Sequence, residues 1–157
     1  MKTFICKITQ ILLILLIILT IAHAFYQSSL PMKESAENSS KVEEIIEEVI
    51  PPETKPGAFI KENIRKLAHF TEFFLLGLWC VLFTLLLKKK RAAAVSLMPF
   101  GMIVALLDET VQIFSERGSS VKDIWIDIFG YASAVFLVLV ICLLIFCVRK
   151  LIRAIRY

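Results

Sequence analysis

Long runs of apolar residues dominate the chain and are separated by short charged segments. Four of these runs reach the length of about 20 residues that a helix needs to cross a lipid bilayer. They cover residues 8–26, 67–87, 92–114 and 124–148. The alternating pattern of a barrel strand is absent, and a bilayer accepts only helices or closed barrels. The pattern therefore predicts an all-α integral membrane protein, a bundle of four transmembrane helices formed by a single domain.

The composition supports this prediction, and the distribution of charge predicts which side of the membrane each end of the chain faces. The chain is 58% hydrophobic with a mean hydropathy of +0.78, whereas soluble domains are about 45–50% apolar. Lys and Arg cluster densely before the first run, at Lys88–Arg91, and in the tail after residue 148. On the other side they are spread over longer segments and mixed with Glu. The positive-inside rule then predicts cytoplasmic N and C termini. The net charge of +4 reflects this topology, so we expect membrane lipids as partners and no nucleic acid.

The first run has a second possible interpretation. Ala22-His23-Ala24 has the form of a signal-peptide cleavage site that follows an apolar stretch. Cleavage there would leave three spans. Either interpretation places residues 27–66 outside the cytoplasm.

The outer segment, residues 27–66, contains a predicted short amphipathic helix. Residues 27–40 are rich in turn-forming residues and are expected to form a loop. Ser40 and Glu43 have the spacing of a capping box, and two prolines follow residue 50. The apolar positions have helical spacing and comprise Val42, Ile45, Ile46, Val49 and Ile50. We expect this helix to dock on the outer ends of the bundle or to remain a partly frayed linker.

Ionisable residues within the runs all lie near the ends that are predicted to face outward. Such groups are costly in a membrane, face the bundle interior and indicate functional sites. On the second and third spans they fall on one helix face, about 120° wide or less. We expect a polar pocket formed by Arg65, Lys66, His69, Glu72, Asp108, Glu109, Gln112, Arg117, Asp123 and Asp127. After Asp127, Gly130 and Ala134 continue the same stripe as small residues, which favour close helix packing.

The residue types in this pocket allow three interpretations. Ion pairs, such as Arg65 with Asp108, would lock the helices together without any further role. His69 and Glu72, facing the carboxylates of the third span, have the donor types of a divalent metal site. A lone His-x-x-Glu is a weak signal, however, and we expect no metal and no other cofactor. His69 held by a carboxylate would also suit a general base, although no Ser or Cys nucleophile motif lies beside it.

Two segments, residues 65–77 and 108–130, resemble the VanZ-like family of bacterial membrane proteins. That family shows Lys-x-x-His-Phe-x-Glu-Tyr/Phe, then Asp-Glu-x-x-Gln-x-Phe, an Arg, an Asp and Asp/Asn-x-x-Gly. The matching residues are Lys66, His69, Phe70, Glu72, Phe73, Asp108, Glu109, Gln112, Phe114, Arg117, Asp123, Asp127 and Gly130. The family often has Asn in place of Asp127 and a Pro-Gly turn at 115–116. Residues 25–31, FYQSSLP, resemble the family's Ser-Ser exit from the first span, which favours retention of that span.

The resemblance implies a multi-pass protein of the bacterial cell membrane with a role at the cell envelope. The founding member is linked to low-level teicoplanin resistance, and the family has no defined reaction. We therefore expect the outer-leaflet pocket to bind a lipid-linked cell-wall precursor or another envelope ligand. Arg65, Lys66 and Arg117 would hold its phosphate or carboxylate. The alternative is a membrane enzyme in which His69 and a neighbouring carboxylate act on a lipid-linked substrate. Transport is less favoured, because the inner halves of the spans carry no polar site.

Overall fold

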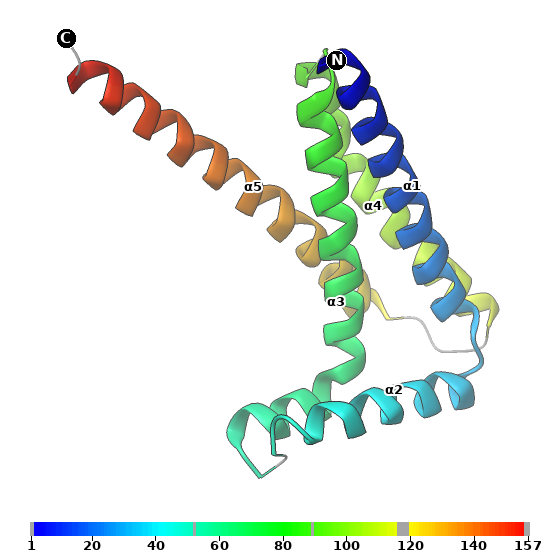
Figure 1. The fold of residues 1–157 in the computed structure, drawn as a ribbon. Helices are drawn as coiled ribbons and strands as arrows, with labels where there is room; N and C mark the ends of the chain where they lie inside the picture. Colours follow the sequence, from blue (N-terminus) through cyan, green and yellow to red (C-terminus); the bar gives the residue numbers. More distant parts are fainter. Residues whose placement is uncertain (1, 52, 89, 116–119, 156–157) are drawn as a thin grey trace.

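The computed structural model describes residues 2–51, 53–88, 90–115 and 120–155, which form five α-helices and no strand (Figure 1). The helices are α1 (Lys2–Ser29), α2 (Met32–Glu47), α3 (Lys55–Leu86), α4 (Lys90–Phe114) and α5 (Val121–Ile155). All but α2 are long and apolar enough to cross a membrane. This confirms the predicted all-α class with four transmembrane helices.

Helix α3 lies at the centre of the arrangement and contacts every other helix. Figure 1 shows α1, α3 and α4 running side by side, while α5 crosses α3 and then leaves the bundle. Helix α2 lies across the end of the bundle where α1 finishes and α3 begins. Both termini lie on the side opposite α2, which fits an even number of membrane crossings. That this side is cytoplasmic stays a prediction from the Lys and Arg pattern.

Cysteine labelling tests the orientation. In a variant without the four native cysteines, Ser40→Cys should react with a membrane-impermeant maleimide added to intact cells. Ile155→Cys should react only after the cells are opened, because it lies at the opposite end of the bundle. Ser40 and Ile155 are both exposed and uncharged, so neither change disturbs the charge pattern that directs insertion. Labelling of Ile155→Cys in intact cells would reverse the topology.

The outer segment is more helical than the sequence predicted. Helix α2 begins at Met32 and ends at Glu47, so most of the expected loop at 27–40 is helix. Pro31 is the N-cap residue. Ser40, expected to cap the helix, lies inside it, where its hydroxyl donates to a backbone carbonyl one turn earlier. The Lys, Glu and Ala residues of this stretch are good helix formers, and their propensity outweighs that of the scattered Ser and Asn residues.

Helix α2 docks on α3 through its acidic side. Lys61 Nζ of α3 lies 2.8 Å from Glu43 Oε1 and 3.0 Å from Glu47 Oε1. No residue of α2 is buried, and Ile45 on its apolar face is 65% exposed. The predicted docking on the bundle therefore occurs without burial of the apolar face. Exposed ion pairs contribute only about 0–1 kcal/mol each, so α2 is held weakly.

Helix α3 begins at Lys55, about three turns before the expected start of its span at residue 67. Thr54 caps it, because its Oγ1 accepts the backbone N–H of Gly57 at 3.1 Å. Pro56 lies in the first turn, where a missing N–H costs no helical hydrogen bond. One continuous helix therefore connects the ion pairs at Lys61 to the polar residues within the bundle.

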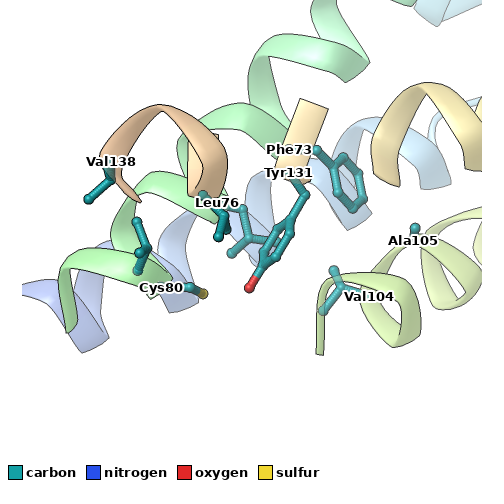
Figure 2. Packing of buried hydrophobic residues seen from close by; sticks show 9 residues of the cluster. Phe73, Leu76, Cys80, Val104, Ala105, Tyr131 and Val138 are labelled. Atoms are coloured by element: carbon teal, nitrogen blue, oxygen red, sulfur yellow. The ribbon is translucent and has the colours of Figure 1, made fainter. Parts of the chain in front are cut away.

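The apolar core joins α3, α4 and α5 (Figure 2). Its largest buried side chains are Phe73 and Leu76 of α3 and Tyr131 of α5. A Cβ atom added to Gly77 would lie 2.4 Å from the backbone oxygen of Tyr131, and one added to Gly130 would lie 2.4 Å from that of Phe70. The backbones of α3 and α5 thus touch at two glycines, a close approach typical of membrane helices.

Candidate functional site

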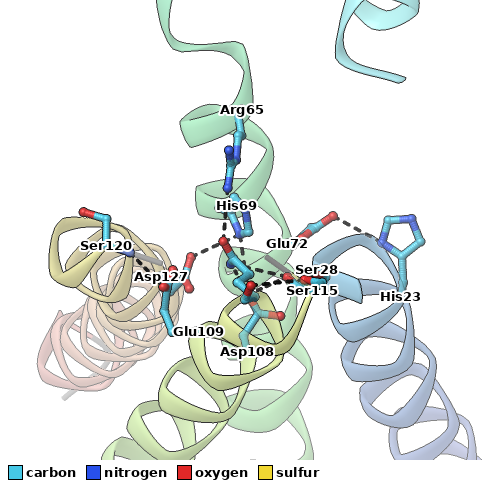
Figure 3. A network of polar contacts seen from close by, with 11 residues as sticks. His23, Ser28, Arg65, His69, Glu72, Asp108, Glu109, Ser115, Ser120 and Asp127 are labelled. Carbon is cyan, nitrogen blue, oxygen red and sulfur yellow. Dashed lines mark hydrogen bonds and ion pairs between the residues drawn. The ribbon is translucent and has the colours of Figure 1, made fainter. Parts of the chain in front are cut away.

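Side chains from all four transmembrane helices meet inside the bundle (Figure 3). We call this group the polar cluster; it comprises Ser28 of α1, Arg65 and His69 of α3, Asp108 and Gln112 of α4, and Asp127 of α5. Four of the six are completely buried, at 0% exposure: Ser28, Asp108, Gln112 and Asp127. Polar groups buried this deeply must find partners within the protein. The contacts inside the cluster therefore decide its stability and its chemistry.

A chain of hydrogen bonds runs through one half of the cluster. Ser28 Oγ donates to Asp108 Oδ2 at 2.8 Å, and Gln112 Nε2 donates to the same oxygen at 3.0 Å. Arg65 Nη2 donates to Gln112 Oε1 at 3.1 Å. The expected ion pair of Arg65 with Asp108 is thus replaced by a connection through the Gln112 amide. The chain ties α1, α3 and α4 together.

The other half of the cluster brings an imidazole between two carboxylates. His69 Nδ1 lies 3.6 Å from Asp127 Oδ1 and 3.9 Å from Asp108 Oδ2. Both distances exceed the usual length of a hydrogen bond. His69 is nearly buried, at 6% exposure. His69 and the two aspartates, which the sequence placed on three different helices, do therefore converge.

Two other predicted pocket residues have different neighbours. Glu109 Oε2 accepts the backbone N–H of Ser120 at 3.0 Å and holds the start of α5 against α4. Glu72 Oε1 lies 3.2 Å from His23 Nδ1 of α1. Glu72 thus points toward α1 and away from Asp108 (Figure 3). These contacts connect neighbouring helices around the cluster.

The remaining predicted residues lie at the edge of the site or outside the described part. Lys66 is exposed, and its Nζ donates to Asn63 Oδ1 at 3.2 Å. Asp123 is half-buried in the first turn of α5. Arg117 falls outside the described residues, so its part in the pocket stays a prediction.

Two cavities flank Arg65 and His69. The larger, ≈ 260 Å³, lies between α3 and α5 and is lined by Glu62, Asn63, Arg65, Lys66, His69, Asp123 and Ile126. The smaller, ≈ 100 Å³, lies where α1, α2 and α3 meet and is lined by Gln27, Ser35, Asn38, Ser39, Val42, Ile64, Arg65, Ala68, His69 and Glu72. The larger cavity is lined by two basic residues, Arg65 and Lys66, which we call the basic wall, and by the acidic residues Glu62 and Asp123. Because it has two cationic side chains and adjoins His69 of the buried cluster, it is the better candidate for a ligand.

Sequence reasoning did not include Ser28, His23 and Ser115 in the site. Ser28 is buried and forms one end of the hydrogen-bond chain, and Ser115 Oγ lies 2.8 Å from the Ser28 carbonyl oxygen. The FYQSSLP segment was the available signal, because it places a small polar residue at the end of an apolar span. His23 offered no comparable signal, since it stands alone among apolar residues.

Comparison with known proteins gives one match. The family model described as VanZ/LLP1 matches residues 11–148, which include every residue of the predicted pocket and the whole polar cluster. Searches of curated proteins and of solved structures found no match. The family match covers most of the chain and agrees with the resemblance carried by the His69 and Asp108 segments. The chain therefore belongs to the VanZ/LLP1 family.

Proposed function

We propose that this protein acts at the bacterial cell envelope by binding an anionic group of a lipid-linked cell-wall precursor or a related envelope ligand, and that this binding supports resistance to teicoplanin-type antibiotics. The observation that carries the proposal is the ≈ 260 Å³ cavity lined by Arg65 and Lys66. It lies at the end of the bundle that the charge pattern predicts to face outward.

The cavity suits a charged headgroup better than a whole lipid. Ligand pockets commonly have volumes of about 300–1,000 Å³, so ≈ 260 Å³ accommodates a small polar group. An acyl or prenyl chain attached to that group would remain in the bilayer beside α3 and α5. Glu62, Asn63 and Asp123 add hydrogen-bond acceptors to the wall. This combination favours a ligand that carries hydroxyl or amide groups next to a phosphate.

Arg65 and Lys66 have different parts in this proposal. Arg65 is held in place by Gln112, so its guanidinium is oriented before a ligand arrives. Such preorganisation lowers the entropic cost of binding. Lys66 is exposed and bonds only to the nearby Asn63 among the described residues. The fold does not depend on its charge, which leaves that charge available for an anion.

Lys66→Gln tests the proposal with little risk to the fold. We expect membrane abundance and melting temperature to stay at wild-type values, while affinity for a polyprenyl diphosphate in nanodiscs falls at least tenfold, since one charge-assisted bond contributes about 1.5–3 kcal/mol. Teicoplanin susceptibility should rise in a host that depends on this protein. Lys55→Gln is the matched control, because Lys55 is an exposed lysine of α3 that lines neither cavity.

Equal affinity and equal protection by wild type and Lys66→Gln would refute the basic wall as a ligand site. If Lys55→Gln lowers affinity as much as Lys66→Gln does, the effect reflects general surface charge and also counts against the proposal.

A second candidate function is a membrane enzyme that acts on a lipid-linked substrate. The observation that favours it is the nearly buried His69 imidazole, 3.6 Å from the Asp127 carboxylate and on the wall of the larger cavity. An imidazole paired with a carboxylate is a common general base. Turnover of a labelled lipid-linked precursor by purified protein, lost in His69→Gln, would favour this candidate over binding alone.

A further inference from the structure

Three buried side chains place metal-binding atoms close together at the centre of the bundle. His69, Asp108 and Asp127 each offer one ligand atom, and these atoms all lie within 4.8 Å of one another. The three residues come from α3, α4 and α5, and their exposed fractions are 6%, 0% and 0%. Figure 3 shows the imidazole and the two carboxylates pointing toward a common space. Exposed acidic groups often gather by chance, but this group is enclosed and contains an imidazole.

The distances between the ligand atoms of these three residues suit the binding of one shared ion better than direct hydrogen bonds. His69 Nδ1 lies 3.6 Å and 3.9 Å from the nearest oxygens of Asp127 and Asp108, which is too long for a hydrogen bond. Atoms that bind one Zn²⁺ ion at about 2.0–2.2 Å are themselves about 3.0–3.6 Å apart. A small inward movement of the side chains would therefore complete the coordination.

The surroundings of the Asp127 carboxylate are a second, independent indication of a bound cation. Its side chain is completely buried, yet neither of its carboxylate oxygens has a hydrogen-bond partner among the residues that the structure describes. A charged carboxylate in such a place carries a large desolvation cost, which either protonation removes or a nearby cation compensates. His69 Nδ1 lies 3.6 Å from Asp127 Oδ1. A divalent cation bound among His69, Asp108 and Asp127 would compensate the negative charges of both aspartates at once.

We infer that His69, Asp108 and Asp127 bind one divalent transition-metal ion. One imidazole nitrogen and two carboxylate oxygens are donors suited to Zn²⁺ or Mn²⁺. Ser28 and Gln112 donate to the Asp108 carboxylate and fix its orientation, as partners of metal ligands commonly do. The inference goes beyond the proposed function, because it requires no anionic ligand and no resistance phenotype.

The site also has an accessible side. Three protein ligands leave at least one coordination position for water or for a ligand oxygen. His69 lines the ≈ 260 Å³ cavity together with Arg65 and Lys66, so this position is reachable from the proposed ligand site. An anionic group in the cavity would then meet the ion as well as the basic wall.

Metal analysis of purified protein tests the inference. The protein, carrying no histidine tag and with Cys6, Cys80, Cys142 and Cys147 replaced, is stripped with EDTA and dialysed against Zn²⁺ or Mn²⁺. We expect about one ion per chain by mass spectrometry and a higher melting temperature with the ion than without it. Asp127→Asn should reduce the bound ion at least tenfold and abolish this rise. Without metal, Asp127→Asn should be at least as stable as wild type, because it removes a buried charge.

Asp123→Asn is the matched control. Asp123 lies one turn before Asp127 on the same helix and is not part of the buried group, so its variant should bind the ion like wild type. His69→Gln provides a second ligand variant and should also lose the ion. The inference is refuted if the wild type binds neither ion stoichiometrically, or if Asp127→Asn and His69→Gln both retain it. A failure of the Lys66→Gln test would leave this result untouched and so would count only against the proposed function.

Discussion

Replacing Gly130 with leucine should separate α5 from α3 and lower the melting temperature of the detergent-solubilised protein. A Cβ atom at this position would lie 2.4 Å from the backbone oxygen of Phe70 and 3.2 Å from its Cα. Backbone atoms of a helix cannot move aside as a flexible side chain can, so the helices must part. Overpacking of this kind costs about 1–3 kcal/mol and occasionally more. Even Gly130→Ala should be destabilising, by less than the leucine variant.

Phe136→Leu is the control for this experiment. Phe136 lies on the same helix and is 70% exposed, so a leucine there meets lipid or detergent and should leave the melting temperature close to that of wild type. If Gly130→Leu melted at the same temperature as Phe136→Leu, the crossing of α3 and α5 would have to be looser than the structure shows.

Asp108→Ala should be the most damaging change in the polar cluster. The alanine leaves the Ser28 hydroxyl and the Gln112 amide, both completely buried, without the oxygen to which they donate. Hydrogen bonds to a charged group contribute about 1.5–3 kcal/mol each, so we expect a loss of about 3 kcal/mol or more. We expect this loss of stability to appear as less protein in the membrane and as a lower melting temperature. Both are measured without added metal. Thr110→Ala is the control, because Thr110 is exposed and donates only to a carbonyl of its own helix.

A double-mutant cycle separates the Ser28 contact from the rest of this effect. Ser28→Ala removes one donor and should cost less than Asp108→Ala. If the two residues interact as the structure shows, the double variant should be more stable than the sum of the two single losses predicts. Strict additivity would mean that Ser28 and Asp108 contribute independently, in conflict with their 2.8 Å hydrogen bond.

The sequence was sufficient to predict the four spans and the convergence of His69, Asp108 and Asp127. Apolar run length determines the spans, and helical periodicity places each polar residue on a face. Lys66 and Glu72 show where this reasoning fails. Both share the polar face of α3 with His69, yet Lys66 is exposed and Glu72 turns toward His23. Periodicity gives the direction of a side chain from its helix but does not identify the neighbouring helix that it meets.

Contacts between distant parts of the chain were the least predictable. Ser28 and Asp108 are separated by 80 residues, and no local pattern relates them. The bridge from Arg65 to Asp108 through Gln112 depends on side-chain length and on the depth at which α3 and α4 pack. In α2, the turn-forming residues predict a loop, although good helix formers between them extend the helix from Met32.

The close crossing at Gly77 and Gly130 has a consequence for how the protein fits its bilayer. The apolar part of α5, residues 124–148, is about 37 Å long at about 1.5 Å per residue, whereas the hydrocarbon core is about 30 Å thick. A helix of excess length can be accommodated by tilting, and Figure 1 shows α5 diverging from the other helices beyond the crossing. We therefore expect the two glycines to act as a pivot. In a thinner or thicker bilayer, the free half of α5 should adjust its inclination while the residues beside the pivot, Asp127 among them, keep their positions.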